Sequence, residues 1–291
     1  MKNMLKKLSP YRFLIFLVLF FMLFDYAAMC YGESHWTVAT NDYEVTKRDH
    51  PEKVWDKVFF GNSDIISSYR EDLSESGYIN LGMDYGVVTD LWELIDQGHI
   101  TIGSDLVIGM NMFLLYDDFD TNPSYIWHRE AWEPYTYFHR GKMKTYLENA
   151  VKTVLHKGTI GTGVAGKIYY YGTMSDSDIL AKEVSFEERF YNLPLDAFDE
   201  NIEALDKIAD WCDEHDVRLR ILWTPVNPLA EDQELILQLT DIVNEWCQER
   251  GIESVDYTDS FPKECFYDGT HMNYEYGAYI FTEEVDKWLS E

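Results

Sequence analysis

The apolar positions of the chain follow one pattern at the N-terminus and another in the body. Residues 13–24 form an unbroken apolar run, and the apolar character continues past Asp25 to residue 31. Further along, short apolar runs alternate with stretches in which apolar residues recur at helical spacing. The patterns therefore predict a separate N-terminal segment, a linker over 32–53 and a folded body over 54–291.

The N-terminal segment, residues 1–31, has the features of a membrane-targeting sequence. It holds four of the 24 basic residues, all before the apolar run, but only one of the 52 acidic residues. By the positive-inside rule, its N-terminus stays cytoplasmic and the body is exported. We expect an uncleaved single-pass anchor in the cell membrane with an extracytoplasmic C-terminal domain. A cleaved signal peptide has the same charged start and apolar core, and this alternative stays open.

The body alternates predicted strands and predicted helices. Strands are predicted over 58–60, 78–81, 106–108, 218–223 and 252–257, and helices over 87–97, 197–214, 229–249 and 274–289. Such alternation indicates an α/β fold, with a parallel sheet covered by helices on both faces. Because ligands bind at the C-terminal ends of parallel strands, the residues that directly follow each strand are the first candidates for a site.

Residues 112–195 interrupt this alternation. Tyr, Trp and His crowd residues 125–140, further tyrosines lie in 167–172, and a basic helix is predicted over 140–157. We interpret 112–195 as an insertion over the strand ends that forms a lid or a partner surface. Its aromatic side chains either stack on sugar rings or pack a small core of their own.

Composition narrows the classes of function. The chain is 46% apolar, which excludes a disordered protein, and its net charge of −28 would repel the phosphate backbone of a nucleic acid. The four cysteines show no spacing typical of metal ligands. Buried free thiols are the favoured interpretation, and a disulfide between Cys212 and Cys247 is the alternative outside the cytosol.

A set of residues suited to acyl transfer follows the predicted strands and the last loop. Asp268 precedes His271 by three residues, so its carboxylate can orient the imidazole. Ser63 directly follows the first strand and is the candidate nucleophile that such a base would activate. The backbone N–H groups of Ser63 and Gly82 and the side-chain amide of Asn111 are candidate oxyanion donors. Because His271 must be neutral to act as a base, we expect activity to fall in acid near a pKa of about 6.5 or lower.

These residues stand in four blocks whose order resembles that of the SGNH (GDSL-like) hydrolase superfamily. The blocks are FFGNSDI with Ser63, INLGMDYG with Gly82, VIGMNMF with Asn111, and YDGTHMNYEYGAY with Asp268 and His271. Asn62 and Met112 stand where the family usually has aspartates. The resemblance covers roughly 54–111 and 197–291. It implies a flavodoxin-like three-layer α/β/α sandwich, a Ser63–His271–Asp268 triad, and no metal or organic cofactor.

Within this superfamily, an N-terminal anchor followed by an exported domain is similar to the accessory proteins of membrane-bound O-acyltransferases, namely the DltD type and the alginate- and cellulose-acetylation group. The resemblance implies a membrane-bound O-acyltransferase as partner and a polysaccharide or glycopolymer as substrate. We therefore expect a membrane-anchored serine O-acyltransferase or esterase. The alternatives are a secreted carbohydrate or lipid esterase without a partner, and a non-catalytic scaffold of the same fold that binds a glycan or a membrane protein.

Overall fold

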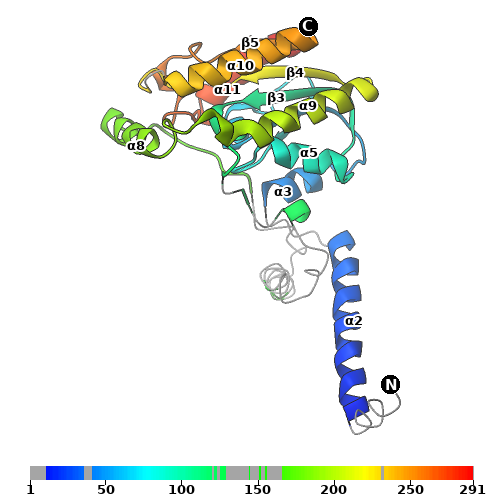
Figure 1. Ribbon diagram of the computed structural model, residues 1–291. Coiled ribbons are helices and arrows are strands. Elements are labelled where there is room, and N and C mark those ends of the chain that lie inside the picture. The colour runs from blue at the N-terminus through cyan, green and yellow to red at the C-terminus, as the bar shows by residue number, and fades with distance from the viewer. Residues whose placement is uncertain are drawn as a thin grey trace. The chain divides into compact units, whose positions relative to one another are not determined.

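The computed structural model describes residues 11–35, 41–119, 121–122, 125–128, 144, 151, 155, 166–230 and 233–290. The chain divides into two compact units (Figure 1). One unit joins residues 42–127 to 167–291, and we call it the α/β unit; the other joins residues 1–41 to 128–166. The basic helix predicted over 140–157, and most of the aromatic stretch 125–140, lie outside the described residues.

The N-terminal apolar run forms a helix, α2, over Arg12–His35. The large apolar side chains between Phe13 and Phe24 are exposed on it. The side chains of α2 are described only as far as Ala27. A search of the described residues finds no helix with the length and apolar character needed to cross a membrane, so the transmembrane anchor predicted within 1–31 is not confirmed.

A five-stranded parallel sheet forms the centre of the α/β unit. Its strands are β1 Trp55–Gly61, β2 Ile79–Gly82, β3 Ile102–Met110, β4 Arg218–Trp223 and β5 Glu253–Asp256. They lie in the order β2-β1-β3-β4-β5, and each neighbouring pair is parallel. The predicted α/β fold with a parallel sheet is therefore confirmed, and every predicted strand overlaps an observed one.

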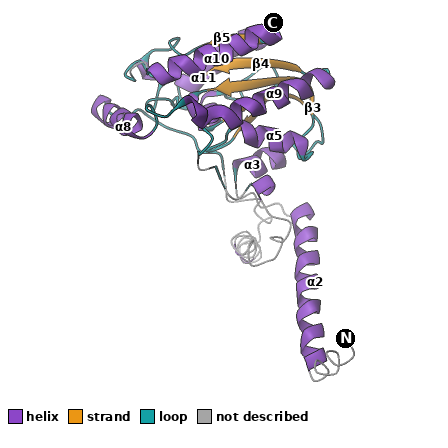
Figure 2. Ribbon diagram, in the orientation of Figure 1, coloured by secondary structure: helices purple, strands orange, loops and turns teal. Residues whose placement is uncertain are grey.

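Helices flank the sheet on both faces (Figure 2). They are α3 Asp42–Asp49, α4 Ser63–Ser68, α5 Val88–Asp96, α6 Met112–Leu115, α9 Asp199–Glu214, α10 Glu234–Arg250 and α11 Gly277–Leu289. A further helix, α8 Asp176–Arg189, lies off to one side of the sheet, and 3-10 turns lie at Ile126–His128, Leu195–Phe198 and Lys263–Cys265. The observed α5, α9, α10 and α11 overlap the four predicted helices.

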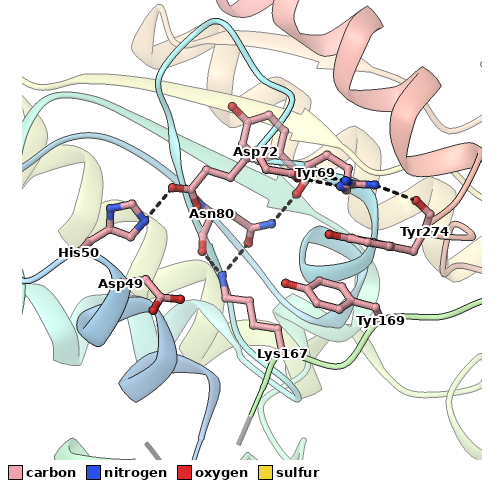
Figure 3. Close-up of a pocket in the computed structure, with 10 residues that line it drawn as sticks. Asp49, His50, Tyr69, Asp72, Asn80, Lys167, Tyr169 and Tyr274 are labelled. Carbon is pink, nitrogen blue, oxygen red and sulfur yellow. Dashed lines mark hydrogen bonds and ion pairs between the residues drawn. The ribbon is translucent and has the colours of Figure 1, made fainter. Parts of the chain in front are cut away.

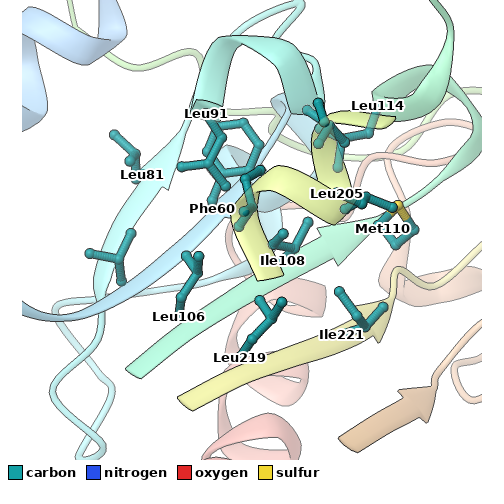
Figure 4. Packing of buried hydrophobic residues seen from close by; sticks show 14 of the residues in the cluster. Phe60, Leu81, Leu91, Leu106, Ile108, Met110, Leu114, Leu205, Leu219 and Ile221 are labelled. Carbon is teal, nitrogen blue, oxygen red and sulfur yellow. The ribbon is translucent and has the colours of Figure 1, made fainter. Parts of the chain in front are cut away.

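Alternating strand residues supply two separate cores. One core takes Phe60, Ile108 and Ile221 from the strands and packs them against α5, α9 and α10 (Figure 4). The other takes the neighbouring residues Phe59 and Val107 and packs them against α4 and α11. Because successive side chains of a strand point to opposite faces, this two-residue period fixes which helices cover which face. The strand ends that carry the candidate site are thereby held between two packed layers.

Three observed elements differ from the sequence-based expectations. Residues 42–49, expected in a linker, form α3, which packs beside β2 and buries Tyr43 and Val45. Within the predicted insertion, α6 and α8 form as helices of the α/β unit.

The cysteines agree with the favoured interpretation. Cys212, Cys247 and Cys265 are buried free thiols, so this prediction is confirmed for them and the alternative of a Cys212–Cys247 disulfide is wrong.

Candidate active site

Ser63 lies where β1 passes into α4. Asn62 caps the helix, because its side-chain oxygen accepts a hydrogen bond from the backbone N–H of Asp64 at 3.0 Å. Two glycines let Ile65 pack into the strand ends: a Cβ added at Gly61 or Gly109 would lie 2.3 or 2.4 Å from the Ile65 side chain. The close approach of α4 to the sheet therefore needs glycine at both positions, and it places Ser63 at the C-terminal edge of the central strands.

The structure brings Ser63, His271 and Asp268 together, although Ser63 is 208 residues away from His271 in sequence. Ser63 Oγ lies 2.8 Å from His271 Nε2, and His271 Nδ1 lies 3.0 and 3.1 Å from the two carboxylate oxygens of Asp268. A neutral imidazole that donates from Nδ1 to Asp268 leaves Nε2 free to accept the proton of Ser63. The arrangement can therefore deprotonate the Ser63 hydroxyl as it attacks.

The loop that carries Asp268 and His271 is held by its own backbone. Tyr267 N–H donates to His271 O at 2.7 Å, and the backbone N–H of His271 donates to Asp268 Oδ1 at 2.9 Å. Asn227, which follows β4, donates from its side chain to Asp268 O at 2.9 Å. Sequence reasoning missed Asn227, because an asparagine in a loop gives no signal of what it will contact. These bonds fix the spacing between carboxylate and imidazole before any substrate is present.

The predicted oxyanion donors differ in the hydrogen bonds that they already make. Within the described part of the chain, the Ser63 N–H at the start of α4 has no hydrogen-bond acceptor, so it can donate to a substrate. The Gly82 N–H instead donates to Asn80 Oδ1 at 2.8 Å in a buried position. A neighbouring side chain on β2 therefore already takes this donor, and the oxyanion role of Gly82 stays a prediction.

Asn111 is close to Ser63 but is fully engaged. Its amide nitrogen donates to Asn62 Oδ1 at 3.1 Å and to Asp64 Oδ2 at 2.8 Å, while its oxygen accepts from Asn62 Nδ2 at 3.0 Å. Asn62 both donates to and accepts from this amide, which an ionised aspartate could not do. The departure at Asn62 thus has a structural reason. Asn111 must release Asp64 or Asn62 before it can donate to a substrate.

Asp64 places a second carboxylate beside the imidazole. Its Oδ1 lies 3.5 Å from His271 Nε2, and its side chain is 6% exposed. Burial raises the pKa of Asp64, against the charge of His271 and hydrogen bonds from Thr270 and Asn111. Sequence reasoning overlooked this residue, because an acidic residue in the first turn of a helix is ordinarily a solvated one.

The two carboxylates set the protonation behaviour of His271. Burial lowers its pKa, but the hydrogen bond with Asp268 and the charges of Asp64 and Asp268 outweigh burial, so the pKa of His271 is raised. The expectation of a pKa of about 6.5 or lower is therefore wrong in direction. Burial alone would raise the pKa of Asp268, but its hydrogen bonds with His271 and Lys182 and the charge of His271 hold it well below its usual value.

Two residues from the predicted insertion contact the triad. Lys182 on α8 lies with its Nζ 2.9 Å from Asp268 Oδ2. The Tyr170 ring packs against His271 with centroids 4.2 Å apart and a tilt of 34°, and it stacks on Tyr267 at 5.0 Å. Tyr170 therefore packs against the loop that carries His271, and not only against aromatic residues of the insertion. Within the described ranges, no three His, Cys, Asp or Glu side chains are grouped so that they could hold a metal ion.

Comparisons with known proteins add only weak similarities. No family model matches the chain, and no curated protein matches it. Two solved structures are similar in fold. A proposed acylhydrolase from Bacteroides fragilis has 12% identity over 88% of this chain and 97% of its own, with a TM-score of 0.43. A GDSL-like lipase from Bacteroides thetaiotaomicron has 11% identity over 83% of this chain and 89% of its own, with a TM-score of 0.40. These values assign no family, so the functional argument rests on the site itself.

Proposed function

We propose that the chain is a serine acyl hydrolase or acyltransferase in which Ser63 is the nucleophile, His271 the general base and acid, and Asp268 the residue that orients His271. The observation that carries this proposal is the continuous contact from Ser63 Oγ through His271 to Asp268, at 2.8 and 3.0 Å. A hydroxyl needs such a base, since serine is a weak nucleophile at neutral pH.

The reaction has two halves. Ser63 Oγ attacks the acyl carbonyl carbon as its proton passes to His271 Nε2, and the imidazolium is stabilised by Asp268. The tetrahedral intermediate then expels the leaving group, which takes the proton from Nε2, and an ester remains on Ser63. In the second half, Nε2 deprotonates a water or a sugar hydroxyl that attacks this ester, and the proton returns to Ser63 Oγ. Water gives hydrolysis and a sugar hydroxyl gives transfer.

Two donors serve the oxyanion in this proposal. The Ser63 N–H is free of acceptors within the described residues, and the Asn111 amide exchanges its bond with Asp64 for one with the oxyanion. The exchange replaces one negatively charged acceptor of this amide by another, since Asp64 Oδ2 accepts from Asn111 at 2.8 Å before the oxyanion forms. The amide is then released when charge develops on the substrate.

The acceptor, the partner and the location extend the proposal beyond the triad. We propose a polysaccharide acceptor, a membrane-bound O-acyltransferase partner, and action at the extracytoplasmic side of a cell membrane. Tyr170 over His271 favours transfer over hydrolysis, since a ring there restricts the access of water to the acyl-enzyme. The exposed apolar side chains of α2 give the chain a surface for contact with lipid or with an apolar partner. Fractionation of cells that express the full chain, with and without residues 1–31, tests the location separately.

The catalytic proposal is tested with p-nitrophenyl acetate as the acyl donor. We expect Ser63→Ala to lower kcat/KM by about a thousandfold or more. Ser67→Ala is the matched control, because Ser67 lies one turn further along α4 and donates to Asp64 O rather than to His271. An equal loss in both variants, or no loss in Ser63→Ala, would remove Ser63 from the mechanism.

A further inference from the structure

A cavity of about 320 Å³ lies in the α/β unit beside the candidate active site (Figure 3). Its walls come from the end of α3 with His50, from the segment after α4 with Arg70 and Glu71, and from Lys167, Tyr169 and Tyr274. None of the triad residues lines it. The volume is at the lower end of the range for small-molecule sites, so it suits one compact unit of a ligand.

The segment 167–171 separates this cavity from the triad. Lys167 and Tyr169 line the cavity, whereas the next residue, Tyr170, packs its ring against His271. In an extended segment successive side chains point in opposite directions, which explains this division. Tyr170 O also accepts a hydrogen bond from Tyr274 N–H at 2.7 Å. A ligand in the cavity would therefore lie across a single extended segment from His271.

The charged residues that line the cavity are two ion pairs, a lysine bound to Asn80, and Asp49, which pairs with Arg48 outside the cavity. Arg70 donates to both carboxylate oxygens of Asp72 at 2.7 and 2.6 Å, and His50 lies 2.6 Å from Glu71. Lys167 donates to the backbone and side-chain oxygens of Asn80, and its ammonium also interacts electrostatically with Glu71 and Asp49. In total, three basic and three acidic residues line the cavity. This balance favours a ligand that has no net charge but many hydrogen-bonding groups.

Two tyrosines give the cavity an aromatic wall. The rings of Tyr169 and Tyr274 lie 4.2 Å apart at 33°, and the Arg70 guanidinium lies over Tyr274 at 4.1 Å. Packing on both sides holds Tyr274 in place, while Tyr169 stays 37% exposed. Tyr169, supported by Tyr274 and partly exposed, is therefore the ring that can contact the apolar face of a sugar, while the polar groups of the cavity bind its hydroxyls.

We propose that this cavity binds one neutral sugar unit of the acyl acceptor, so that another unit of the same acceptor reaches the Ser63 ester on the other side of segment 167–171, an assignment that rests on the proposed acyl-transfer function. The net charge of −28 supports a neutral glycan, because the field of the whole protein opposes the approach of polymers rich in phosphate or uronic acid. The inference thereby restricts the proposed acceptors to glycopolymers whose bound sugar unit carries no charge.

Binding is measured by titration calorimetry on the full-length Ser63→Ala variant, so that the result does not depend on turnover. The probes are cellotetraose and tetra-N-acetylchitotetraose, with tetramannuronate as the acidic comparison. We expect at least one neutral probe to bind, and the added change Tyr169→Ala to weaken it about tenfold, the loss expected for one stacked ring. Ile168→Ala is the matched control, since Ile168 is exposed and does not line the cavity.

The outcomes separate this inference from the proposed function. Equal binding in the Tyr169→Ala and Ile168→Ala variants, tighter binding of tetramannuronate, or no binding of either neutral probe overturns the cavity assignment. If Tyr169→Ala does not fold, Lys167→Met, on the same segment and also lining the cavity, takes its place with the same expectation. In transfer assays on an otherwise wild-type chain, Tyr169→Ala should raise the acceptor KM more than it lowers kcat. An enzyme that binds the neutral probe but never acylates Ser63 would refute the proposed function and leave the binding site standing.

Discussion

At the scale of single residues, the distinctive feature of the site is that His271 faces two carboxylates. Asp268 contacts Nδ1, as a triad carboxylate does, and Asp64 lies 3.5 Å from Nε2 on the side of the reacting hydroxyl. The other groups near His271 are Lys182 through Asp268, Asp84 after β2, and the Tyr170 ring. The imidazolium is therefore stabilised on both sides, which favours proton uptake from Ser63 and raises the pH at which the free base becomes available.

Asp64→Asn tests this second carboxylate. The variant keeps the shape of the side chain and removes its charge, so the pKa of His271 should fall. The acid limb of the kcat/KM–pH profile reports the pKa of the base in the free enzyme, and it should move to lower pH. Glu75→Gln, an exposed change away from the triad, is the control. An unchanged acid limb in Asp64→Asn would mean that Asp64 is already neutral in the active enzyme.

At the scale of elements, α8 joins the site through Lys182. The ammonium of Lys182 pairs with Asp268 and lowers the pKa of His271 by its charge. Lys182→Met should therefore move the acid limb of the pH profile to higher pH, opposite to Asp64→Asn, and lower kcat moderately. Lys182→Arg should restore most of the wild-type profile. If Lys182→Met and Asp64→Asn both move the acid limb in the same direction, this electrostatic account is contradicted.

Another junction between elements is held by a buried ion pair. Arg220 on β4 is fully buried; it pairs with Asp105 on β3 at 3.0 Å and donates to Trp288 O at the end of α11 at 3.2 Å. Asp105→Ala leaves this charge unpaired and should lower the free energy of unfolding by about 3–5 kcal/mol. Glu253→Ala, which breaks the exposed pair with Arg218, should change it by less than about 1 kcal/mol. Urea denaturation measures both, and similar losses would contradict the account.

The elements also show what the sequence could predict. Short apolar runs predicted the strands, helical periods predicted the four large helices, and the order of the four blocks led us to expect Ser63 near His271. The helices α3, α6 and α8 were missed because α3 and α6 are too short to show a period and α8 buries only Ile179. The engagement of Gly82 by Asn80 and the position of Asp64 depend on side-chain geometry between segments, which no local pattern encodes.

At the scale of the whole molecule, the shifted pKa values predict how stability depends on pH. The pKa values of His271 and His50, and of the buried carboxyl of Asp42, are raised in the folded state. A raised folded pKa contributes stability at low pH that is lost as the pH rises through that pKa. The net charge of −28 adds a repulsion among the acidic groups of the folded protein, and this repulsion also grows as the pH rises. We therefore expect the free energy of unfolding to rise as the pH falls from 8 to 6.

In stronger acid the trend should reverse. The pKa values of Asp268 and Glu71 are lowered in the folded state, so the stability that they contribute is present above their unfolded values of about 4 and is lost as the pH falls further. Lys167, with its pKa lowered to about 8, opposes the main trend only above that pH. Denaturation at a series of pH values should show a maximum between these limits. A free energy of unfolding that keeps rising toward pH 9 would contradict the prediction.

The central claim is that the partly buried imidazole of His271 makes the Ser63 hydroxyl reactive, and covalent labelling tests it most directly. The full-length chain is treated with a fluorophosphonate, and the modified peptide is identified by mass spectrometry. The account predicts one adduct on Ser63, much slower labelling in His271→Ala, and no adduct in Ser63→Ala. The account is contradicted if folded wild-type protein carries no adduct on Ser63, or if His271→Ala is labelled at the same rate as wild type.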